Sequence, residues 1–279
     1  MESKTFVPKN GMGSAGDQAL RAPQTEAKRI VGELIAKARA AQRRFEQCSQ
    51  AEVDEAVVAA GWAIMEPGRN RALAEMAVRD TGLGDVEDKV TKNYRKTLGL
   101  LRDLKGVKTV GIVAEYPERG LVEIARPVGV VAAITPSTNP AATPANKVIN
   151  ALKCRNAVII APSPKGWSTS QALIGYIHAE LKKLGLPIDL VQCLPAPVTK
   201  DTTQELMRQA DLVVATGSQS NIRAAYTCGT PAFGVGAGNV ASIIDSSANL
   251  AEAAAAIMAS KTFDNATSCS SENSVVILD

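Results

Sequence analysis

The sequence predicts an α/β protein: a Rossmann-like parallel sheet with helices on both faces, preceded by an N-terminal helical segment and a β-hairpin, and followed by the start of a second α/β domain. Short apolar runs of strand length recur from residue 128 onward, and helical patterns separate the early ones. These runs are apolar throughout, which is typical of parallel strands covered on both faces. Sheets of this kind bind ligands at the carboxyl ends of their strands.

The first part of the chain is expected to be helical after a tail. Residues 1–24 mix glycine, proline, serine and charges without a period, which predicts a mobile tail. Four helices are expected over residues 25–106. The second opens with a Ser49–Glu52 capping box, and the later ones end at Gly82 and Gly106. We expect the charged side chains of the fourth helix to face solvent: Glu87, Asp88, Lys89, Lys92, Arg95 and Lys96.

A two-residue period over residues 107–127, interrupted by Pro117-Glu118-Arg119-Gly120, predicts the β-hairpin. The expected strands of the parallel sheet then lie at residues 128–134, 157–161, 190–193, 212–215 and 241–244. The clearest helices among them are expected at residues 167–184 and 249–261, each with helix-end signals. His178, the single histidine, falls inside the first of these and is expected to be a packing or surface residue.

Composition narrows the function classes. The chain of 279 residues carries 31 basic and 28 acidic residues, a net charge of +3, which gives no argument for nucleic acid or a membrane as partner. No apolar run approaches the roughly 18 residues that span a bilayer, and the first thirty residues hold no export signal, so we expect a cytoplasmic protein. The five cysteines are odd in number and lack CxxC spacing, which fits neither a disulfide framework nor a metal site.

Two glycine patterns look like nucleotide motifs but lack the required context. The GxGxxG spacing at residues 11–16 follows no strand, and Pro23 interrupts any helix after it. The GVGAG run places Gly236 and Gly238 before a strand instead of a helix. Their expected use is close approach of the backbone to a ligand or to another segment of the chain.

Three segments carry the chemistry. TPSTNP at residues 135–140 follows a buried strand; it is either a proline-rich turn or the place where the Asn139 amide donates to a developing oxyanion. ATGS at residues 215–218 joins a strand to a helix whose free N–H groups suit a pyrophosphate, although any such joint has this form. Cys269 lies in a polar loop, where access favours the nucleophilic thiolate; the alternative is a small buried hydrophobe.

Together these segments resemble the CoA-acylating branch of the aldehyde dehydrogenase superfamily over residues 25–279. The strings that carry the resemblance are TPSTNP at 135–140, ATGS at 215–218, GTPAFGVGAGN at 229–239, SKTFDNATSCSSENSVV at 260–276, and TGLG with VEDK at 81–89. The segment TKNYRKTLGLLRD at 91–103 resembles the acylating sulfoacetaldehyde dehydrogenases. Five motifs in the same order make the resemblance specific.

The resemblance implies a role for each matching residue. Cys269 matches the nucleophile, and Asn139 with the Cys269 backbone N–H would hold the oxyanion. A small aldehyde would be oxidised with NAD, or with NADP as the alternative, and coenzyme A would take the acyl group from the Cys269 thioester; the reverse reaction would reduce acyl-CoA. The matching cofactor positions are Thr135, Pro136, Ser137, Pro162, Lys165, Gly217, Ser218, Gly236 and Gly238.

Two departures distinguish the chain from the hydrolytic branch of that superfamily. Residues 233–240 contain no carboxylate to activate water, so a thiol is the expected acyl acceptor. In the hydrolytic branch, the second strand of the sheet ends with a lysine that holds the cofactor ribose. Here that strand ends at Ala161-Pro162, and Lys165 follows three residues later. The choice between NAD and NADP as cofactor is therefore left open. A hydrolytic aldehyde dehydrogenase and a non-catalytic nucleotide-binding module are the alternative functions.

The resemblance also implies an incomplete chain, because family members are considerably longer. We expect residues 25–262 to form the cofactor domain and residues 263–279 to begin a catalytic domain whose remainder is absent. The strand at residues 274–278 is then expected to be unpaired. The hairpin at residues 107–127 would join subunits of a homo-oligomer in the full-length form.

Overall fold

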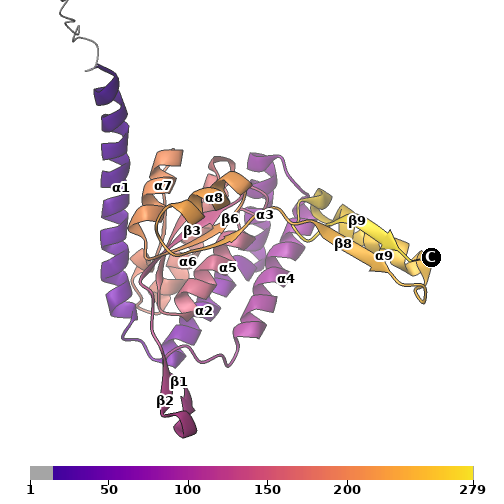
Figure 1. Cartoon of the computed structure of the whole chain (residues 1–279), viewed down its shortest axis with the longest axis horizontal. Helices are drawn as coiled ribbons and strands as arrows, with labels where there is room; N and C mark the ends of the chain where they lie inside the picture. Colours follow the sequence, from indigo (N-terminus) through magenta and orange to yellow (C-terminus); the bar gives the residue numbers. More distant parts are fainter. Residues whose placement is uncertain (1–14, 279) are drawn as a thin grey trace, which may run out of the picture.

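Figure 1 shows a five-stranded sheet surrounded by helices, with a hairpin at one end and a smaller two-stranded unit at the side. This computed structural model describes residues 15–278, and side chains from residue 26. The helices are α1 Ala15–Phe45, α2 Gln50–Met65, α3 Pro67–Thr81, α4 Val86–Leu104, α5 Ala142–Lys153, α6 Trp167–Lys183, α7 Lys200–Gln209, α8 Gln219–Thr227 and α9 Leu250–Thr262. The strands are β1 Gly111–Tyr116, β2 Leu121–Ala125, β3 Val130–Thr135, β4 Ala157–Pro162, β5 Val191–Cys193, β6 Leu212–Thr216, β7 Ala232–Val235, β8 Val240–Ile244 and β9 Glu272–Ile277.

The main sheet is parallel, with the order β5-β4-β3-β6-β7. Helices α5 and α6 contact β3, β4 and β5, and α2 packs behind them, whereas α1 contacts α7, and α8 contacts β6 and β7. Right-handed crossovers place α5 and α6 on one face and α7 and α8 on the other. The predicted fold class, a parallel sheet with helices on both faces after a helical segment and a hairpin, is therefore confirmed.

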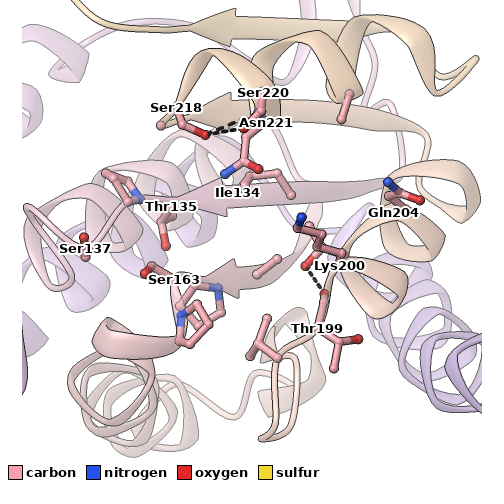
Figure 2. A pocket seen from close by; sticks show the side chains of 18 of the residues that line it. Ile134, Thr135, Ser137, Ser163, Thr199, Lys200, Gln204, Ser218, Ser220 and Asn221 are labelled. Carbon is pink, nitrogen blue, oxygen red and sulfur yellow. Dashed lines mark hydrogen bonds between the residues drawn. The ribbon is translucent and has the colours of Figure 1, made fainter.

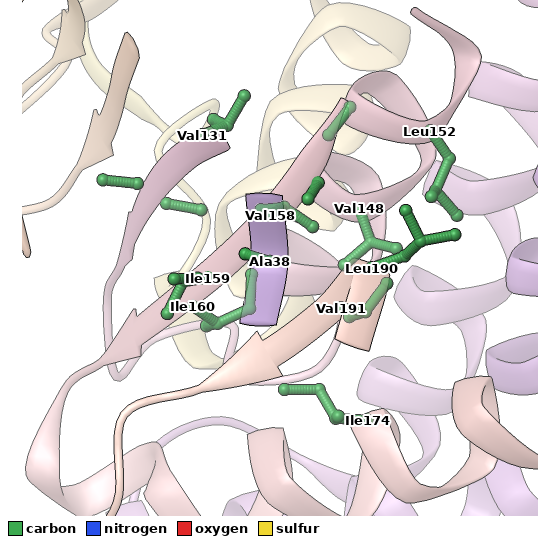
Figure 3. Packing of buried hydrophobic residues seen from close by; sticks show 14 of the residues in the cluster. Ala38, Val131, Val148, Leu152, Val158, Ile159, Ile160, Ile174, Leu190 and Val191 are labelled. Atoms are coloured by element: carbon green, nitrogen blue, oxygen red, sulfur yellow. The ribbon is translucent and has the colours of Figure 1, made fainter. Parts of the chain in front are cut away.

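The core lies along β3 and β4, whose residues are all buried. Figure 3 shows Val158 and Ile160 of β4 among the side chains that pack with Val148 and Leu152 of α5 and with Leu190. Burying these aliphatic side chains on both faces of the strands supplies the main favourable term in folding. It also fixes the strand ends, from which the candidate site is built.

Helix α1 starts earlier than the sequence indicated. It begins at Ala15, so the expected start of the helical segment at residue 25 is wrong. The mobile tail expected over residues 1–24 stays a prediction, and residues 1–14 lie outside the described part of the chain. Residues 18–22, QALRA, are strong helix formers, and the helix continues through Pro23. Its later part packs onto the sheet, where Arg39 donates to both carboxylate oxygens of Asp211 at 2.9 Å.

The remaining helical segment and the hairpin follow the sequence closely. The Ser49–Glu52 capping box is present at the start of α2, and Gly82 ends α3 in the left-handed conformation. Strands β1 and β2 pair in an antiparallel hairpin, as predicted. His178 packs within α6, with Nε2 at 2.6 Å from the Val191 carbonyl oxygen. Within residues 15–278 the structure contains no helix that is long and apolar enough to cross a membrane.

Strands β8 and β9 differ from the expectation. Residues 241–244 were expected in the main sheet and residues 274–278 were expected to be unpaired, but β8 and β9 pair with each other in parallel. Helix α9 contacts both strands and completes a βαβ unit at the side of the molecule (Figure 1). An apolar strand after a helix satisfies its backbone groups on the nearest parallel edge, which here is β8. The expected domain boundary at residues 262–263 stays a prediction.

Replacing Ile159 with alanine tests the position of the core. Ile159 lies in β4 and is fully buried, so the substitution leaves a cavity and is expected to lower the free energy of unfolding by about 2–5 kcal/mol. Urea unfolding measures the change. The control is Ile243→Ala in β8, because Ile243 is 72% exposed and should change stability by less than about 0.5 kcal/mol. Equal losses in the two variants would contradict the assignment.

Candidate active site

A cavity of about 560 Å³ opens at the carboxyl ends of β3, β4 and β6 (Figure 2). The strand ends, the turns after them and the first turns of α7 and α8 form its wall. The chain leaves β3 toward β4 on one side and returns to β6 on the other, so the cavity lies at the point where the strand order reverses. Open α/β sheets bind their ligands at this point, and the volume is in the usual range of ligand pockets.

Two helices point their amino termini at this cavity. Ser218 caps α8, where its Oγ accepts from the Asn221 backbone N–H at 3.4 Å. Thr199 caps α7, where its Oγ1 accepts from the Thr202 N–H at 3.1 Å. The remaining free N–H groups and the positive ends of the helix dipoles favour an anionic group. No aspartate or glutamate is among the described residues that line the cavity.

Thr135, the last residue of β3, indicates that the cavity suits a polar ligand. Thr135 is only 3% exposed, and within the described part of the chain its Oγ1 has no hydrogen-bond partner. Buried hydroxyls are nearly always paired, so a bound group with a donor or acceptor would satisfy it. Together with the two helix termini, this orphaned hydroxyl fits the phosphate and hydroxyl groups of a nucleotide.

The cavity brings together six of the nine predicted cofactor positions: Thr135, Pro136, Ser137, Pro162, Gly217 and Ser218. The other three lie elsewhere. Lys165 is exposed in the short 3-10 turn Pro164–Gly166 and does not line the cavity. Gly236 and Gly238 lie in the loop after β7, outside the lining.

These two glycines allow the close chain approach that the sequence predicted. A Cβ at Gly236 would come within 2.8 Å of the Gln219 amide at the start of α8. A Cβ at Gly238 would come within 2.9 Å of the Cys269 carbonyl oxygen. The loop after β7 thus lies directly against the Cys269 backbone.

The contribution of α7 to the cavity was not among the predictions from the sequence. Thr199, Lys200 and Thr203 line the cavity opposite the β3 turn, together with Gln204. A signal was present, because Thr199 and Thr202 form a capping box after the β5 strand. It marks a fourth strand-to-helix connection at the ligand-bearing edge of the sheet.

Asn139 and Cys269 lie on two separate segments, the turn after β3 and the loop before β9. Asn139 is 9% exposed and lies in the turn before α5. Cys269 lies in the turn before β9 and is exposed to solvent, as the polar loop around it predicted. Neither lines the cavity. Their catalytic roles stay predictions. No cluster of histidine, cysteine and acidic side chains that could hold a metal ion occurs among the described residues.

The loop that carries Cys269 begins with an unusual backbone. Asp264, Asn265 and Ala266, in the turn η4 Phe263–Ala266, have φ angles of 51°, 49° and 58°. The left-handed region costs an L-residue roughly 1–2 kcal/mol, so contacts elsewhere must hold this turn in place. The expectation that all charges of α4 face solvent is wrong at this point: Lys89 and Lys92 are each 3% exposed, because both amines donate to the buried Asp264 carboxylate.

One further buried amine supports the floor of the cavity. Lys147 of α5 donates from Nζ to the carbonyl oxygens of Ile134 at 2.8 Å and Val214 at 2.6 Å, which ties the ends of β3 and β6 together. Among the described residues it has no carboxylate within ion-pair distance. Burial lowers the pKa of Lys147 to about 7.

A doubly wound parallel sheet with a polar pocket at its switch point is the architecture of nucleotide-binding α/β proteins. The chain matches the aldehyde dehydrogenase family model over residues 13–279, and it belongs to the aldehyde dehydrogenase family. The family assignment from the sequence motifs is thereby confirmed.

Several of the similar proteins are named as acylating or acetylating enzymes. The chain is 70% identical over 257 residues to a sulfoacetaldehyde dehydrogenase (acylating) of Cupriavidus necator, covering 92% of this chain and 52% of that protein. Among solved structures, an acetylating aldehyde dehydrogenase of Geobacillus thermoglucosidasius matches with a TM-score of 0.86 and 39% identity, over 92% of this chain and 57% of that one.

A propionaldehyde dehydrogenase of Rhodopseudomonas palustris, solved with bound propionyl-CoA, matches with a TM-score of 0.79 and 29% identity over 89% of this chain and 54% of that one. The chain thus spans about half the length of these three proteins.

Replacing Lys147 with methionine tests the buried amine. Its folded pKa of about 7 lies below the ordinary 10.5, so between these values the unfolded chain binds one more proton than the folded chain. The free energy of unfolding of the parent chain should therefore rise with pH in this window relative to Lys147→Met, by up to about 1.4 kcal/mol per pH unit. Urea unfolding across the window measures the difference. A difference that stays constant or falls with pH would contradict this assignment.

Proposed function

We propose that this chain is the nucleotide-binding and nucleophile-bearing part of a CoA-acylating aldehyde dehydrogenase. The observation that carries the proposal is the polar cavity at the switch point, lined by Thr135 with its orphaned hydroxyl and by the capped end of α8 at Ser218. An accessible Cys269 lies in the loop that approaches Gly238. The printed names of the most similar proteins, above all the 70% identical sulfoacetaldehyde dehydrogenase, support the acylating reaction.

The proposed cofactor is a nicotinamide adenine dinucleotide, NAD with NADP as the alternative, which supplies a hydride acceptor when bound. The α8 terminus at Gly217 and Ser218 would hold its diphosphate, because free N–H groups and a helix dipole meet there. Thr135 and the turn after it would hold the neighbouring polar groups. Lys200, at the opposite wall, adds a positive charge on the side of α7.

Cys269 is the proposed nucleophile. Its thiolate would attack the aldehyde carbon to form a C–S bond, while the carbonyl electron pair moves to oxygen. The Asn139 amide and the Cys269 backbone N–H would donate to that oxygen. Loss of a hydride from that carbon, which the bound dinucleotide would accept, would leave an acyl thioester on Cys269. Attack by the coenzyme A thiolate would then return the Cys269 sulfur as thiolate and release acyl-CoA.

Coenzyme A is preferred over water as acyl acceptor because of what surrounds the nucleophile. The loop after β7 lies against the Cys269 backbone at Gly238, and residues 233–240 contain no carboxylate. Water attack needs a general base within hydrogen-bonding reach, directly or through one water, whereas a thiol of modest pKa forms its own nucleophile.

We propose sulfoacetaldehyde as the aldehyde and a homo-oligomer of the full-length form as the working assembly.

The test of this proposal uses Cys269→Ser with Cys154→Ser as the control, because Cys154 is also exposed but lies at the end of α5. The full-length form that contains this chain is incubated with sulfoacetaldehyde, coenzyme A and NAD or NADP, and separately with an acyl-CoA alone. We expect acyl-CoA formation and an acyl mass on the Cys269 peptide in the parent and in Cys154→Ser, and neither in Cys269→Ser.

Other outcomes decide between the alternatives. Free acid formed without coenzyme A would identify a hydrolytic enzyme. Nucleotide binding with no acyl mass on Cys269 in any condition would identify a non-catalytic nucleotide-binding module. Unchanged acylation in Cys269→Ser would remove Cys269 as the nucleophile.

A further inference from the structure

Asp264 is the most completely bonded carboxylate in the described part of the chain, and it lies five residues before Cys269. Its side chain is fully buried. It accepts from the Lys92 ammonium, from Lys89 Nζ at 3.2 Å and from Thr267 Oγ1 at 2.5 Å. The first two donors belong to α4, far away in the sequence, so this carboxylate joins the Cys269 loop to the N-terminal helical segment.

Backbone contacts strengthen the same junction. Asp264 Oδ1 accepts from the Asp85 N–H at 3.0 Å, and the Asp264 N–H donates to Asp88 Oδ2 at 2.7 Å. Both partners belong to the start of α4, where Asp85 is the N-cap. The turn at residues 263–266, whose backbone is left-handed, is thus held from outside by α4.

Lys89 makes a second contact that Lys92 does not make. Its Nζ also donates to the Thr138 carbonyl oxygen at 3.2 Å. Thr138 directly precedes Asn139 in the turn after β3. One buried ammonium therefore connects the segment of the proposed nucleophile with the segment of the proposed oxyanion donor.

Gly84 makes room for this arrangement. Its φ is +80°, and a Cβ there would overlap Asp264 Oδ1 and come within 2.7 Å of Lys89 Nζ. The TGLG string at residues 81–84 thus has a physical use beyond ending α3. It lets a backbone segment approach the carboxylate more closely than any residue with a side chain would permit.

The Asp264 carboxylate is held in its ionised form by the donors around it. Burial raises the pKa of Asp264, but the hydrogen bonds from Lys92, Thr267 and the Asp85 N–H outweigh it and hold that pKa below the ordinary value. Burial lowers the pKa of Lys92 more than its bond to Asp264 raises it. Removing one partner would leave a buried charge with fewer hydrogen bonds, which is far more costly than removing an exposed one.

We propose that Lys89 and Asp264 are positioning residues for the acyl-transfer site: the Lys89 ammonium links the Thr138 carbonyl to the Asp264 carboxylate and thereby sets Cys269 against Asn139. The effect on acyl transfer rests on the proposed function, whereas the contacts of Lys89 and Asp264 are present without any substrate. Lys92 donates to Asp264 in the Cys269 loop but, within the described part of the chain, makes no hydrogen bond to the turn after β3. The pair acts through the backbone and touches no reacting atom.

Hydrogen–deuterium exchange with Lys89→Met, Lys92→Met and Lys153→Met tests the proposal. Lys153 is an equally buried lysine in an ion pair, bonded to Asp54 at 2.5 Å, but on the α5–α2 contact remote from both segments. We expect Lys89→Met to speed amide exchange by at least about tenfold in both residues 137–139 and residues 263–271. Lys92→Met should speed it in residues 263–271 only, and Lys153→Met in neither.

A second pair of variants covers the case in which the lysine variants do not fold. Thr267→Val removes one hydroxyl donor to Asp264 at nearly constant volume, and Thr267→Ser retains it. Exchange in residues 263–271 should speed up in Thr267→Val and return to the parent rate in Thr267→Ser. Unchanged exchange in both would overturn the proposal, as would a Lys89→Met variant that leaves residues 137–139 unaffected.

The rate at which an acyl-CoA acylates Cys269, measured by mass on folded protein, separates positioning from stability. It should fall at least about tenfold in Lys89→Met and stay at the parent value in Lys153→Met. If exchange responds as expected but the full-length parent is never acylated, the contact between the two segments is supported and the proposed function fails. If the parent is acylated and Lys89→Met is acylated equally fast, the proposed function stands and the positioning role fails.

Discussion

The pairing of β3 with β4 on one edge and β6 on the other determines where the residues that line the cavity lie. β3 is buried along its whole length, so its carboxyl end at Thr135 has one position relative to its neighbours. The ends of β4 and β6 reach the same level, and Lys147 fastens β3 to β6 through two carbonyl oxygens. The polar cavity follows from this arrangement, because the chain must turn away in opposite directions at the end of the sheet.

Charge at the site comes from helix ends and buried amines. Helices α7 and α8 present their positive ends to the cavity, and the described lining contains no acid to oppose an anionic ligand. The buried amine of Lys89 serves a different purpose, since a carboxylate and a carbonyl take up its hydrogen bonds. The same residue type thus supports the cavity floor at Lys147 and joins two loops at Lys89.

Local signals in the sequence predicted most of the fold. The capping box at Ser49, the left-handed glycine at Gly82 and the apolar runs of β3 and β4 each depend on neighbouring residues, and each is present in the structure. The pairing of β8 with β9 could not be predicted in the same way, because an apolar strand pattern does not identify its partner.

The candidate site shows the same limit. Strand-end motifs located Thr135 and Ser218 correctly, because position at the carboxyl edge follows from the order of elements alone. The burial of Lys89 and Lys92 depends on Asp264, about 170 residues further along, and helical periodicity carries no information about such a contact. The solvent-facing prediction for α4 failed for this reason.

The central claim, that the cavity at the end of β3 holds a dinucleotide, is tested most directly by amide exchange with and without NAD or NADP. The account predicts saturable binding that slows exchange at residues 135–137 and 217–221, in the turn after β3 and the first turn of α8. Saturable binding that protects other segments and leaves these two unchanged would contradict it, and so would the absence of any binding by the folded chain.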